Sequence, residues 1–370
     1  MASRAGAGVE MRRSERSFDS GLARDLFRAA PVVHLASTDA DGTPVLRALN
    51  VVVVENGEDW ILAYHGAPAG EKVGCTGRPA VLCCEEIVAS IPSWFTTRER
   101  ACPATTWYRS AQAHGILEEV EDPVVRAAVL STLMARFQPE GRHRPISAEE
   151  PMYAAAIRGL SIVQLVPTRV SAKVSVGQDK PVAFRHAAMR GLWERGAPGD
   201  LPALRLALSL APEPWPAEWQ RGEVRLHPHL GAGEIPEAVA LIRAAEWNAA
   251  LSDDQIGAAF LGSAAWVGAF VEGALVGTAR AVSDGAKFAY VADVLVREEW
   301  RGKRVGDALM RLLLEHPAVR RCRRVVLRTR LAHGFYERLG FATFAMEGVR
   351  PWMALERAGE RTSAPASNRQ

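Results

Sequence analysis

The stretch with the clearest chemical pattern is VLVREEWRGKRVGDAL, residues 294–309, where an apolar run ends in charges and a basic, glycine-containing loop follows. Gly302 and Gly306 lie among arginines and a lysine at the point where a helix is expected to begin. The first amides of a helix lack intrahelical acceptors and carry partial positive charge, so they bind phosphate without any side chain. Glycine lets a ligand approach the backbone, and nearby cations add charge-assisted contacts. The stretch therefore predicts a diphosphate-binding loop after a strand.

The surroundings of this loop resemble the GNAT superfamily of acyl-CoA N-acyltransferases over about residues 222–357. The order of strand, RGKRVG loop, helix, strand and AHGFYERLGF carries the resemblance. The family's loop reads Arg or Gln, two residues, Gly, one residue, then Gly or Ala. Here Arg301 and Gly306 match the ends, while Arg304 replaces the middle glycine, which leaves the backbone less free. The resemblance implies an α/β fold, a mixed sheet flanked by helices, with acetyl-CoA as cosubstrate. It also implies that the pantetheine arm and the diphosphate contact Val294, Val296, Arg301, Gly302, Lys303, Arg304, Val305, Gly306 and Asp307.

Acyl transfer from a thioester to an amine needs a neutral amine, a donor for the carbonyl oxygen and a proton for the departing thiolate. Tyr336, in HGFYERLGF, matches the family tyrosine that protonates or hydrogen-bonds the thiolate. Asp293 lies where family members often have a carboxylate, and two interpretations stay open. It either draws a proton from the amine through water, or it is a structural carboxylate that faces away from the cleft. Trp247 and Asn248 fall in the region that shapes the acceptor pocket in the family, and a packed tryptophan is the alternative. The implied acceptor is an amine of a small molecule or peptide.

A second candidate phosphate site lies in YHGAPAGEKVGCTGRPAVLCC, residues 64–84, where HG ends a strand and Gly70 and Lys72 precede the next one. This pattern resembles the phosphate-binding region of the pyridoxamine 5'-phosphate oxidase-like flavoproteins, particularly their nitroimidazole-resistance branch. The likeness covers about residues 11–190. Downstream, CPATTWYRSAQAHGILEEVED at 102–122 is similar to that branch's Cys, Thr, Tyr-Arg-Ser pattern.

The second resemblance implies an antiparallel split β-barrel that forms a homodimer and holds FMN across the subunit interface. Lys72 is the expected phosphate ligand because its ammonium is a compact charge. Segment 85–105 is an insertion expected to fold over the site. Two functions remain open: an FMN-dependent oxidoreductase, or a flavin-binding, sensing or dimerisation module beside an active acyltransferase. The residues implied for the flavin site are His65, Gly66, Lys72, Asn50 and, from across the interface, Arg109 and Ser110.

Several strands at short spacing, separated by turn residues, predict a barrel in the first half of the chain. The expected helices are 21–30 and 122–137, and the expected strands are 31–38, 44–54, 59–66, 80–86, 107–118 and 160–176. In the second half, alternation of strands and helices predicts an α/β layer architecture. Its expected helices are 235–249, 253–261, 303–314 and 332–339, and its expected strands are 222–227, 265–271, 274–283, 287–297, 323–328 and a last one after 339.

A chain of 370 residues exceeds the size at which single cores tend to divide, so two domains are expected. The stretch APEPWPAEW, residues 211–219, has three prolines that suit an extended connector. The predicted boundaries are 11–190 for the split-barrel domain, 191–221 for a helical and proline-rich linker, and 222–357 for the acyltransferase domain.

The overall composition favours a soluble protein. A net charge of +3 gives little reason to expect nucleic acid as a partner. No window reaches the roughly 18 to 20 uninterrupted apolar residues of a membrane span, and the N-terminus lacks the apolar centre of a secretory signal. We therefore expect a cytoplasmic protein that does not enter a membrane. Five cysteines without a CxxC pair argue against a disulfide framework and a zinc site.

Overall fold

A computed structural model describes residues 14–56, 59–70, 72–210 and 214–343 of the chain. The chain forms two compact units, Met1–Leu327 and Arg328–Gln370, and each is described by itself. No helix among the described residues is both long and apolar enough to cross a membrane.

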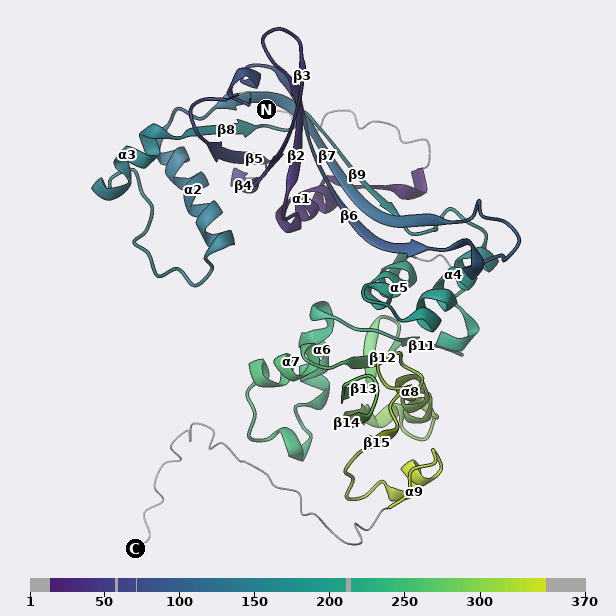
Figure 1. The fold of residues 1–370 in the computed structure, drawn as a ribbon. Helices are drawn as coiled ribbons and strands as arrows, with labels where there is room; N and C mark the ends of the chain where they lie inside the picture. Colours follow the sequence, from purple (N-terminus) through teal and green to yellow (C-terminus); the bar gives the residue numbers. More distant parts are fainter. Residues whose placement is uncertain (1–13, 57–58, 71, 211–213, 344–370) are drawn as a thin grey trace, which may run out of the picture. The chain divides into compact units, whose positions relative to one another are not determined.

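The N-terminal part is an antiparallel sheet that splits along its longest strand (Figure 1). Its strands follow the order β3-β2-β6-β7-β8-β5-β4, and β9 pairs with both β1 and β7. One stretch of β7, from Tyr108 to His114, pairs with β9, whereas Leu117–Glu119 pairs with β8. This change of partner divides the sheet and confirms the predicted split barrel. The strands are β1 Ser17–Phe18, β2 Val33–Thr38, β3 Pro44–Leu49, β4 Val52–Asn56, β5 Asp59–Gly66, β6 Pro79–Ile91, β7 Thr105–Glu119, β8 Ser161–Leu165 and β9 Arg169–Ser175.

Helix α1 (Ser20–Ala29) covers the main core of this sheet. Asp19 begins the helix by accepting a hydrogen bond from the Leu22 amide at 3.0 Å, a cap worth about 1 kcal/mol. The helix buries Leu26 and Phe27 against strand residues such as Leu35 and Leu82. A smaller core lies beneath α2 (Pro123–Phe137), while α3 spans Pro151–Gly159. The sequence predicted α1 and α2 but not α3.

Three expectations for this part were wrong. The strand expected at 160–176 is two strands, because β8 pairs with β5 whereas β9 pairs with β1 and β7. Segment 44–54 is not one strand, because β3 pairs with β2 whereas β4 pairs with β5, so the chain changes partner around Asn50. Segment 85–105 is not an insertion that folds over the site. Instead β6 continues to Ile91 and β7 begins at Thr105, and the two form a long paired arm (Figure 1).

Helices α4 (Val182–Arg195) and α5 (Asp200–Leu210) follow the barrel and pack against this arm. Phe95, at the end of the arm, occupies the space that a side chain at Gly191 would need. The Arg195 guanidinium donates to Asp200 at 2.6 Å and to the Ser90 carbonyl at 2.9 Å. Glycine at position 191 therefore permits the arm to contact α4 closely.

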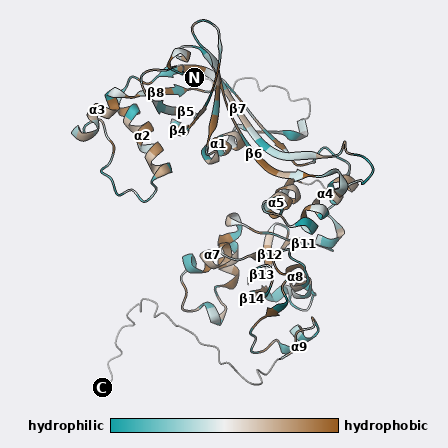
Figure 2. Ribbon diagram, in the orientation of Figure 1, coloured by the Kyte–Doolittle hydropathy of each residue, from teal (hydrophilic) through white to brown (hydrophobic). Residues whose placement is uncertain are grey.

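The C-terminal part contains a six-stranded sheet in the order β10-β11-β12-β13-β14-β15. All pairs are antiparallel except β14 and β15, so the sheet is mixed, as predicted. Helix α6 packs on β13 and α7, and α8, which is rich in hydrophobic residues, packs on β12 and β13 (Figure 2). The strands are β10 Gln220–Arg221, β11 Val224–His227, β12 Ala265–Val271, β13 Ala274–Ser283, β14 Phe288–Val296 and β15 Arg324–Val326, and the helices are α6 Ile235–Ile242, α7 Asp253–Leu261 and α8 Val305–Leu314.

The second unit contains helix α9 (His333–Glu337), which is shorter than the predicted helix at 332–339. The strand expected to follow it extends into residues outside those described.

Candidate functional site

Helix α8 begins at an exposed loop without a capping side chain. Arg304 is the N-cap residue, and the first backbone bond into the helix runs from the Ala308 amide to the Arg304 carbonyl at 3.1 Å. The preceding amides of the first turn therefore lack helical acceptors. Gly302 has φ of 75°, and nothing lies within 4 Å of the place where its side chain would be. This open, positively polarised helix start has the geometry expected for anion binding.

The cations of this loop are held in different ways. The Lys303 ammonium lies 4.2 Å from the centre of the Trp300 ring, and Arg301 Nε donates to the Val296 carbonyl at 3.1 Å. Arg304 adopts the left-handed conformation, with φ of 62°. The residue that replaces the family's middle glycine thus takes a backbone conformation that glycine adopts at lower cost.

Strand β14 has a bulge and an open edge just before this loop. Thr278 of β13 lies opposite Leu295, but Arg280 lies opposite Ala292, so β14 has one residue more than β13 between these pairs. Strand β15 pairs with β14 only over Phe288–Tyr290. The strand segment that contains Val294 and Val296 therefore has no β15 partner within the described part of the chain. Such a bulge re-aims side chains and interrupts the ladder, which leaves backbone groups for a ligand.

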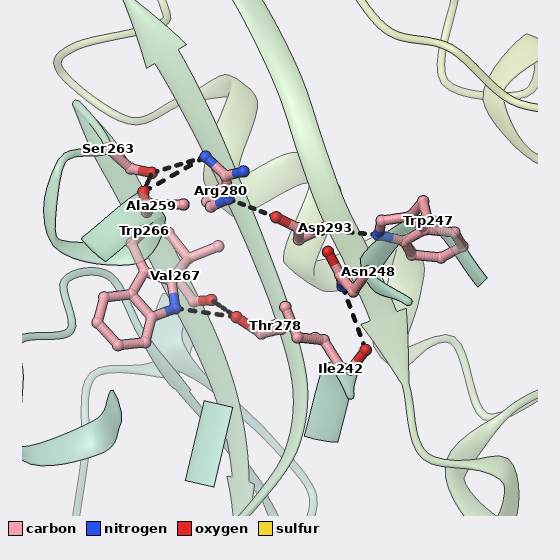
Figure 3. A network of polar contacts seen from close by, with 10 residues as sticks. All are labelled: Ile242, Trp247, Asn248, Ala259, Ser263, Trp266, Val267, Thr278, Arg280 and Asp293. Carbon is pink, nitrogen blue, oxygen red and sulfur yellow. Dashed lines mark hydrogen bonds and ion pairs between the residues drawn. The ribbon is translucent and has the colours of Figure 1, made fainter. Parts of the chain in front are cut away.

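Asp293 lies at the bulge and belongs to a buried polar network (Figure 3). Its side chain is 7% exposed and accepts hydrogen bonds at both oxygens, from Arg280 Nε at 2.5 Å and from Trp247 Nε1 at 2.8 Å. The Arg280 guanidinium also donates to Ser263 Oγ at 3.2 Å, and it lies over the Phe260 ring. Of the two interpretations of Asp293, this geometry favours the structural carboxylate, because both oxygens are engaged by donors.

Trp247 is the exposed member of this network. Its side chain is 56% exposed although the indole nitrogen is bound to Asp293. Together with Leu295, Arg301 and residues of α6, it lines a groove of about 610 Å³. Asn248, by contrast, is 4% exposed and donates to the Ile242 carbonyl, so it closes the turn after α6.

Tyr336 belongs to the second unit and is described within it. The side chain is half-buried, and its ring centre lies 4.9 Å from that of Phe335 and 5.9 Å from that of Phe341. Burial raises the pKa of the Tyr336 phenol, so the group stays protonated at neutral pH. His333, at the start of α9, is exposed.

In the N-terminal domain, three of the predicted flavin-site residues lie together. A side chain at Gly66 would overlap the Lys72 ammonium, so Lys72 folds back over the end of β5. Burial lowers the pKa of His65, and the charge of Lys72 lowers it further. Asn50 is exposed and precedes β4, whose first residue, Val52, lies opposite Ala63, two residues before His65. A cation above a glycine backbone suits a phosphate group.

Arg109 and Ser110 lie elsewhere on the sheet. They pair with Val174 and Lys173 of β9, whereas β8, which carries the partner of His65, meets β7 near Glu119. Along β7, Arg109 and Glu119 are about 30 Å apart. The Arg109 guanidinium donates to Glu86 at 2.5 Å. The structure of one chain therefore does not gather Arg109 with Lys72.

Arg280 is a member of the Asp293 network that no sequence motif indicated as functional. Arg280 is the one charged residue in ALVGTARAVS, a strand whose other residues are mostly small or apolar, and this pattern could have identified it. A lone arginine in such a strand indicates a buried carboxylate partner, and here that partner is Asp293.

Two family models match the chain. The model described as pyridoxamine 5'-phosphate oxidase matches residues 19–174, and the model described as the acetyltransferase (GNAT) family matches residues 233–341. No curated protein shows significant sequence similarity to the chain.

Solved structures resemble one domain or the other. A GNAT-family protein from Xanthomonas campestris pv. campestris is 31% identical, and the match covers 36% of this chain and 96% of that protein, with a TM-score of 0.32. A protein from Bacteroides thetaiotaomicron named for 5-nitroimidazole antibiotic resistance is 18% identical, covering 43% of this chain and 86% of that one, with a TM-score of 0.33. A flavocytochrome from Azotobacter vinelandii is 19% identical, covering 45% and 72%, with a TM-score of 0.36.

The two family models match separate segments of the chain. Residues 19–174 therefore contain a pyridoxamine 5'-phosphate oxidase-like domain and residues 233–341 contain a GNAT acetyltransferase domain, so that one chain joins a domain of each kind.

Proposed function

We propose that the C-terminal domain transfers the acetyl group of acetyl-CoA to an amine of a small molecule or peptide. The observation that carries this proposal is the uncapped start of α8, which follows the bulged strand β14 after the loop 297–304. The amides of residues 302–307 bind the diphosphate, and the open edge of β14 at Val294 and Val296 accepts the pantetheine arm as an added strand.

The proposed reaction is an acyl transfer, in which the acetyl carbonyl carbon exchanges its bond to sulfur for a bond to nitrogen. The neutral amine attacks the thioester carbon, a new C–N bond forms, and the C–S bond breaks. The carbonyl oxygen gains negative charge and needs a donor, for which an unpaired amide beside the bulge is suited. Tyr336 gives its proton to the departing thiolate, and its raised pKa keeps that proton available at neutral pH. The amine loses its proton to solvent, and Asp293 holds Trp247 at the acceptor groove.

Gly306 provides the test of the diphosphate-binding loop, because it lies in the first turn of α8. Gly306→Leu should weaken acetyl-CoA binding by about tenfold or more, since the side chain enters the space of the phosphates. Gly306→Ala is the matched control, because alanine favours the helix and adds a single methyl group. Calorimetry with acetyl-CoA measures both variants. Unchanged affinity of the leucine variant would contradict the proposal.

We further propose that the N-terminal domain binds FMN and catalyses an oxidoreduction. The residues around Lys72 fit a flavin phosphate, because an ammonium faces a glycine backbone at the end of β5. Lys72 and Gly66 hold the phosphate, and His65 and Asn50 contact it or the ring. Arg109 and Ser110 of a second copy complete the pocket in a homodimer, which agrees with their separation from Lys72 within one chain. The bound flavin supplies the redox chemistry, and the protein supplies position and electrostatics.

Loss of the Lys72 charge should abolish flavin retention. Lys72→Ala should purify without yellow colour, because the phosphate loses its cation. Lys287→Ala is the control, since Lys287 is an exposed lysine in a turn of the other domain. Absorbance of the purified proteins measures the flavin, and a fully loaded Lys72→Ala variant would refute the assignment.

The alternative function for the N-terminal domain is flavin binding, sensing or dimerisation without catalysis. The two functions differ in one measurement on the flavin-loaded protein. Reduction by NAD(P)H or a chemical reductant, followed by reoxidation that depends on an added substrate, supports the oxidoreductase. A flavin that never exchanges electrons with any substrate supports the binding role.

A further inference from the structure

A pocket of about 460 Å³ lies at the arm, and its lining contains none of the residues assigned to either site above. We define the arm pocket by the residues that line it. They are Arg16 at the end of η1 (Ser14–Arg16), Arg100, Cys102, Pro103, Ala104, Thr105 and Trp107 around the start of β7, Ser175 and Gly177 at the end of β9, and Lys180, Pro181 and Phe184 around the start of α4. Its volume is in the range of pockets that bind small organic molecules.

One wall contains a buried donor that lacks a partner. Trp107 is 1% exposed, and its Nε1 hydrogen has no acceptor among the described residues. The Nε1 edge of the indole faces Gly177, whose side chain, if it had one, would begin 3.6 Å from Nε1. Both residues line the arm pocket. The unsatisfied N–H therefore lies beside a pocket-lining glycine that places no side chain over it. A buried indole N–H normally finds an acceptor, so a ligand oxygen is the expected partner.

The charges around the arm pocket are positive. Arg16, Arg100 and Lys180 line it, and its lining includes no aspartate or glutamate. Arg16 is neutralised by Asp179 at 2.7 Å. Arg100 and Lys180 have no carboxylate within ion-pair distance in the part of the chain that the structure describes, although Lys180 lies 6.0 Å from the Phe184 ring centre. Two uncompensated cations favour an anionic ligand.

The start of α4 adds to this preference. The helix has 14 residues and begins at Val182 after Pro181, without a capping side chain. Its first internal bond runs from the Arg185 amide to the Pro181 carbonyl at 3.1 Å, which leaves the earlier amides of the first turn without helical acceptors. Lys180, Pro181 and Phe184 line the pocket at this end. The positive end of the helix dipole therefore lies at the same wall as the cations.

The remaining lining is apolar. Phe184, the Trp107 ring, Pro103 and Pro181 surround the space between the charged residues. We propose that the arm pocket binds a small organic anion, in which a carboxylate or phosphate contacts Lys180, Arg100 and Trp107 Nε1 while a ring packs on the apolar wall. Its lining shares no residue with the sites proposed for acetyl-CoA and for the flavin, although Arg109 follows Trp107 by two residues on β7.

Calorimetry on the full-length protein tests the proposal with benzoate and phenyl phosphate as probes. At least one of the two should bind, and the stronger one tells which oxyanion the site prefers. Benzamide, which keeps the ring but has no charge, should bind at least about tenfold more weakly. Inorganic phosphate should also bind more weakly, because it lacks the ring. Absence of binding by both aromatic anions, or equal binding of benzamide or inorganic phosphate, would overturn the proposal.

Variants locate the binding. Lys180→Gln combined with Arg100→Gln should weaken the better probe by about tenfold or more. Arg98→Gln, an exposed arginine of the same turn that does not line the pocket, should leave affinity unchanged. Lys72→Ala should also leave it unchanged, and a loss there would place the probe in the flavin site and refute the arm pocket.

A spectroscopic readout keeps the test independent of folding in the charge variants. The ¹⁵N–¹H indole resonance of Trp107, assigned by its disappearance in Trp107→Phe, should shift downfield when the probe binds to the wild-type protein, because Nε1 gains an acceptor. A Trp107 resonance that stays fixed at saturating probe would count against the site.

Discussion

Asp293 has a backbone conformation that few side chains tolerate, with φ of 48°. Aspartate enters the left-handed region more readily than most residues, but the conformation is still costly. Here the cost is offset by two hydrogen bonds that hold the carboxylate between Arg280 and Trp247 (Figure 3). The side chain therefore connects three elements, β13, β14 and the turn after α6, around the bulge.

Replacing Asp293 separates its structural role from a role as general base. Asp293→Asn removes the ion pair with Arg280. Because the Asp293 side chain is 7% exposed and the Arg280 side chain 15% exposed, the free energy of unfolding should fall by about 3 kcal/mol. At low pH, kcat/KM for acetyl transfer should still fall as the pH decreases, because a structural Asp293 is not the group whose protonation stops the reaction. Urea denaturation and a pH–rate profile measure the two effects.

The control for this variant is Asp253→Asn, which removes the exposed partner of Arg243 and should cost about 1 kcal/mol or less. If the acidic limb vanishes in Asp293→Asn together with a loss of kcat of roughly a hundredfold or more, Asp293 is the base instead.

At the scale of elements, the loop before α8 obtains its shape from two left-handed residues, Gly302 and Arg304. Glycine pays no steric cost for this conformation, whereas arginine does. The loop nevertheless presents its amides at an uncapped helix start. The chain thus retains the backbone geometry that the family's glycine allows, with a cation where that glycine would stand.

Arg304→Gly should stabilise the protein. Removal of left-handed strain should raise the free energy of unfolding by about 1 kcal/mol, measured by urea denaturation. Arg301→Gly is the matched control, because Arg301 has an ordinary φ of −68°, so glycine there relieves no strain, adds freedom to the unfolded chain and removes the hydrogen bond to the Val296 carbonyl. The explanation fails if both variants lose stability equally.

At the scale of the molecule, helix α4 contacts residues from both family segments. Gly191 receives Phe95 of the arm, and the Trp193 ring lies 5.5 Å from that of His316, which follows α8. His316 and His227 are both buried. Burial lowers the pKa of His316 to about 3, helped by His229 and Arg320, and burial lowers the pKa of His227 to about 4.

These histidines should make the protein less stable in acid. Above the unfolded pKa of about 6.5 they are neutral in both states and contribute no pH dependence. As pH falls below that value the unfolded state takes up protons first, so stability falls by about 1.4 kcal/mol per pH unit for each histidine, until the folded pKa is reached. Urea denaturation between these pH values measures the slope.

A substitution at His227 isolates one of the two contributions. His227→Phe keeps a ring beside Trp215 and Phe270, whose centres lie 4.9 and 4.5 Å away, and it should reduce the slope by one proton. His143→Phe, at an exposed position, should leave the slope unchanged. An unaltered slope in His227→Phe would mean that this histidine takes up its proton at the same pH in the folded protein as in the unfolded chain.

Sequence alone determined the two fold families and most of the elements. Motifs such as RGKRVG and HG with Gly70 and Lys72 are local, and the periods of strands and helices are local as well, so neighbouring residues suffice to predict them. The wrong predictions also result from reading local patterns alone. The strand predicted at 44–54 has apolar residues on both sides of Asn50, and its two different partners, β2 and β5, divide it there.

Tertiary structure decided which distant residues meet. Only the register of β13 and β14 reveals the bulge at Asp293, and only packing brings Arg280 and Trp247 to it. The same holds for the separation of Arg109 from Lys72 and for the unpaired indole nitrogen of Trp107 at the arm pocket. Contacts between segments far apart in sequence depend on pairing and burial across the whole sheet, which no local pattern encodes.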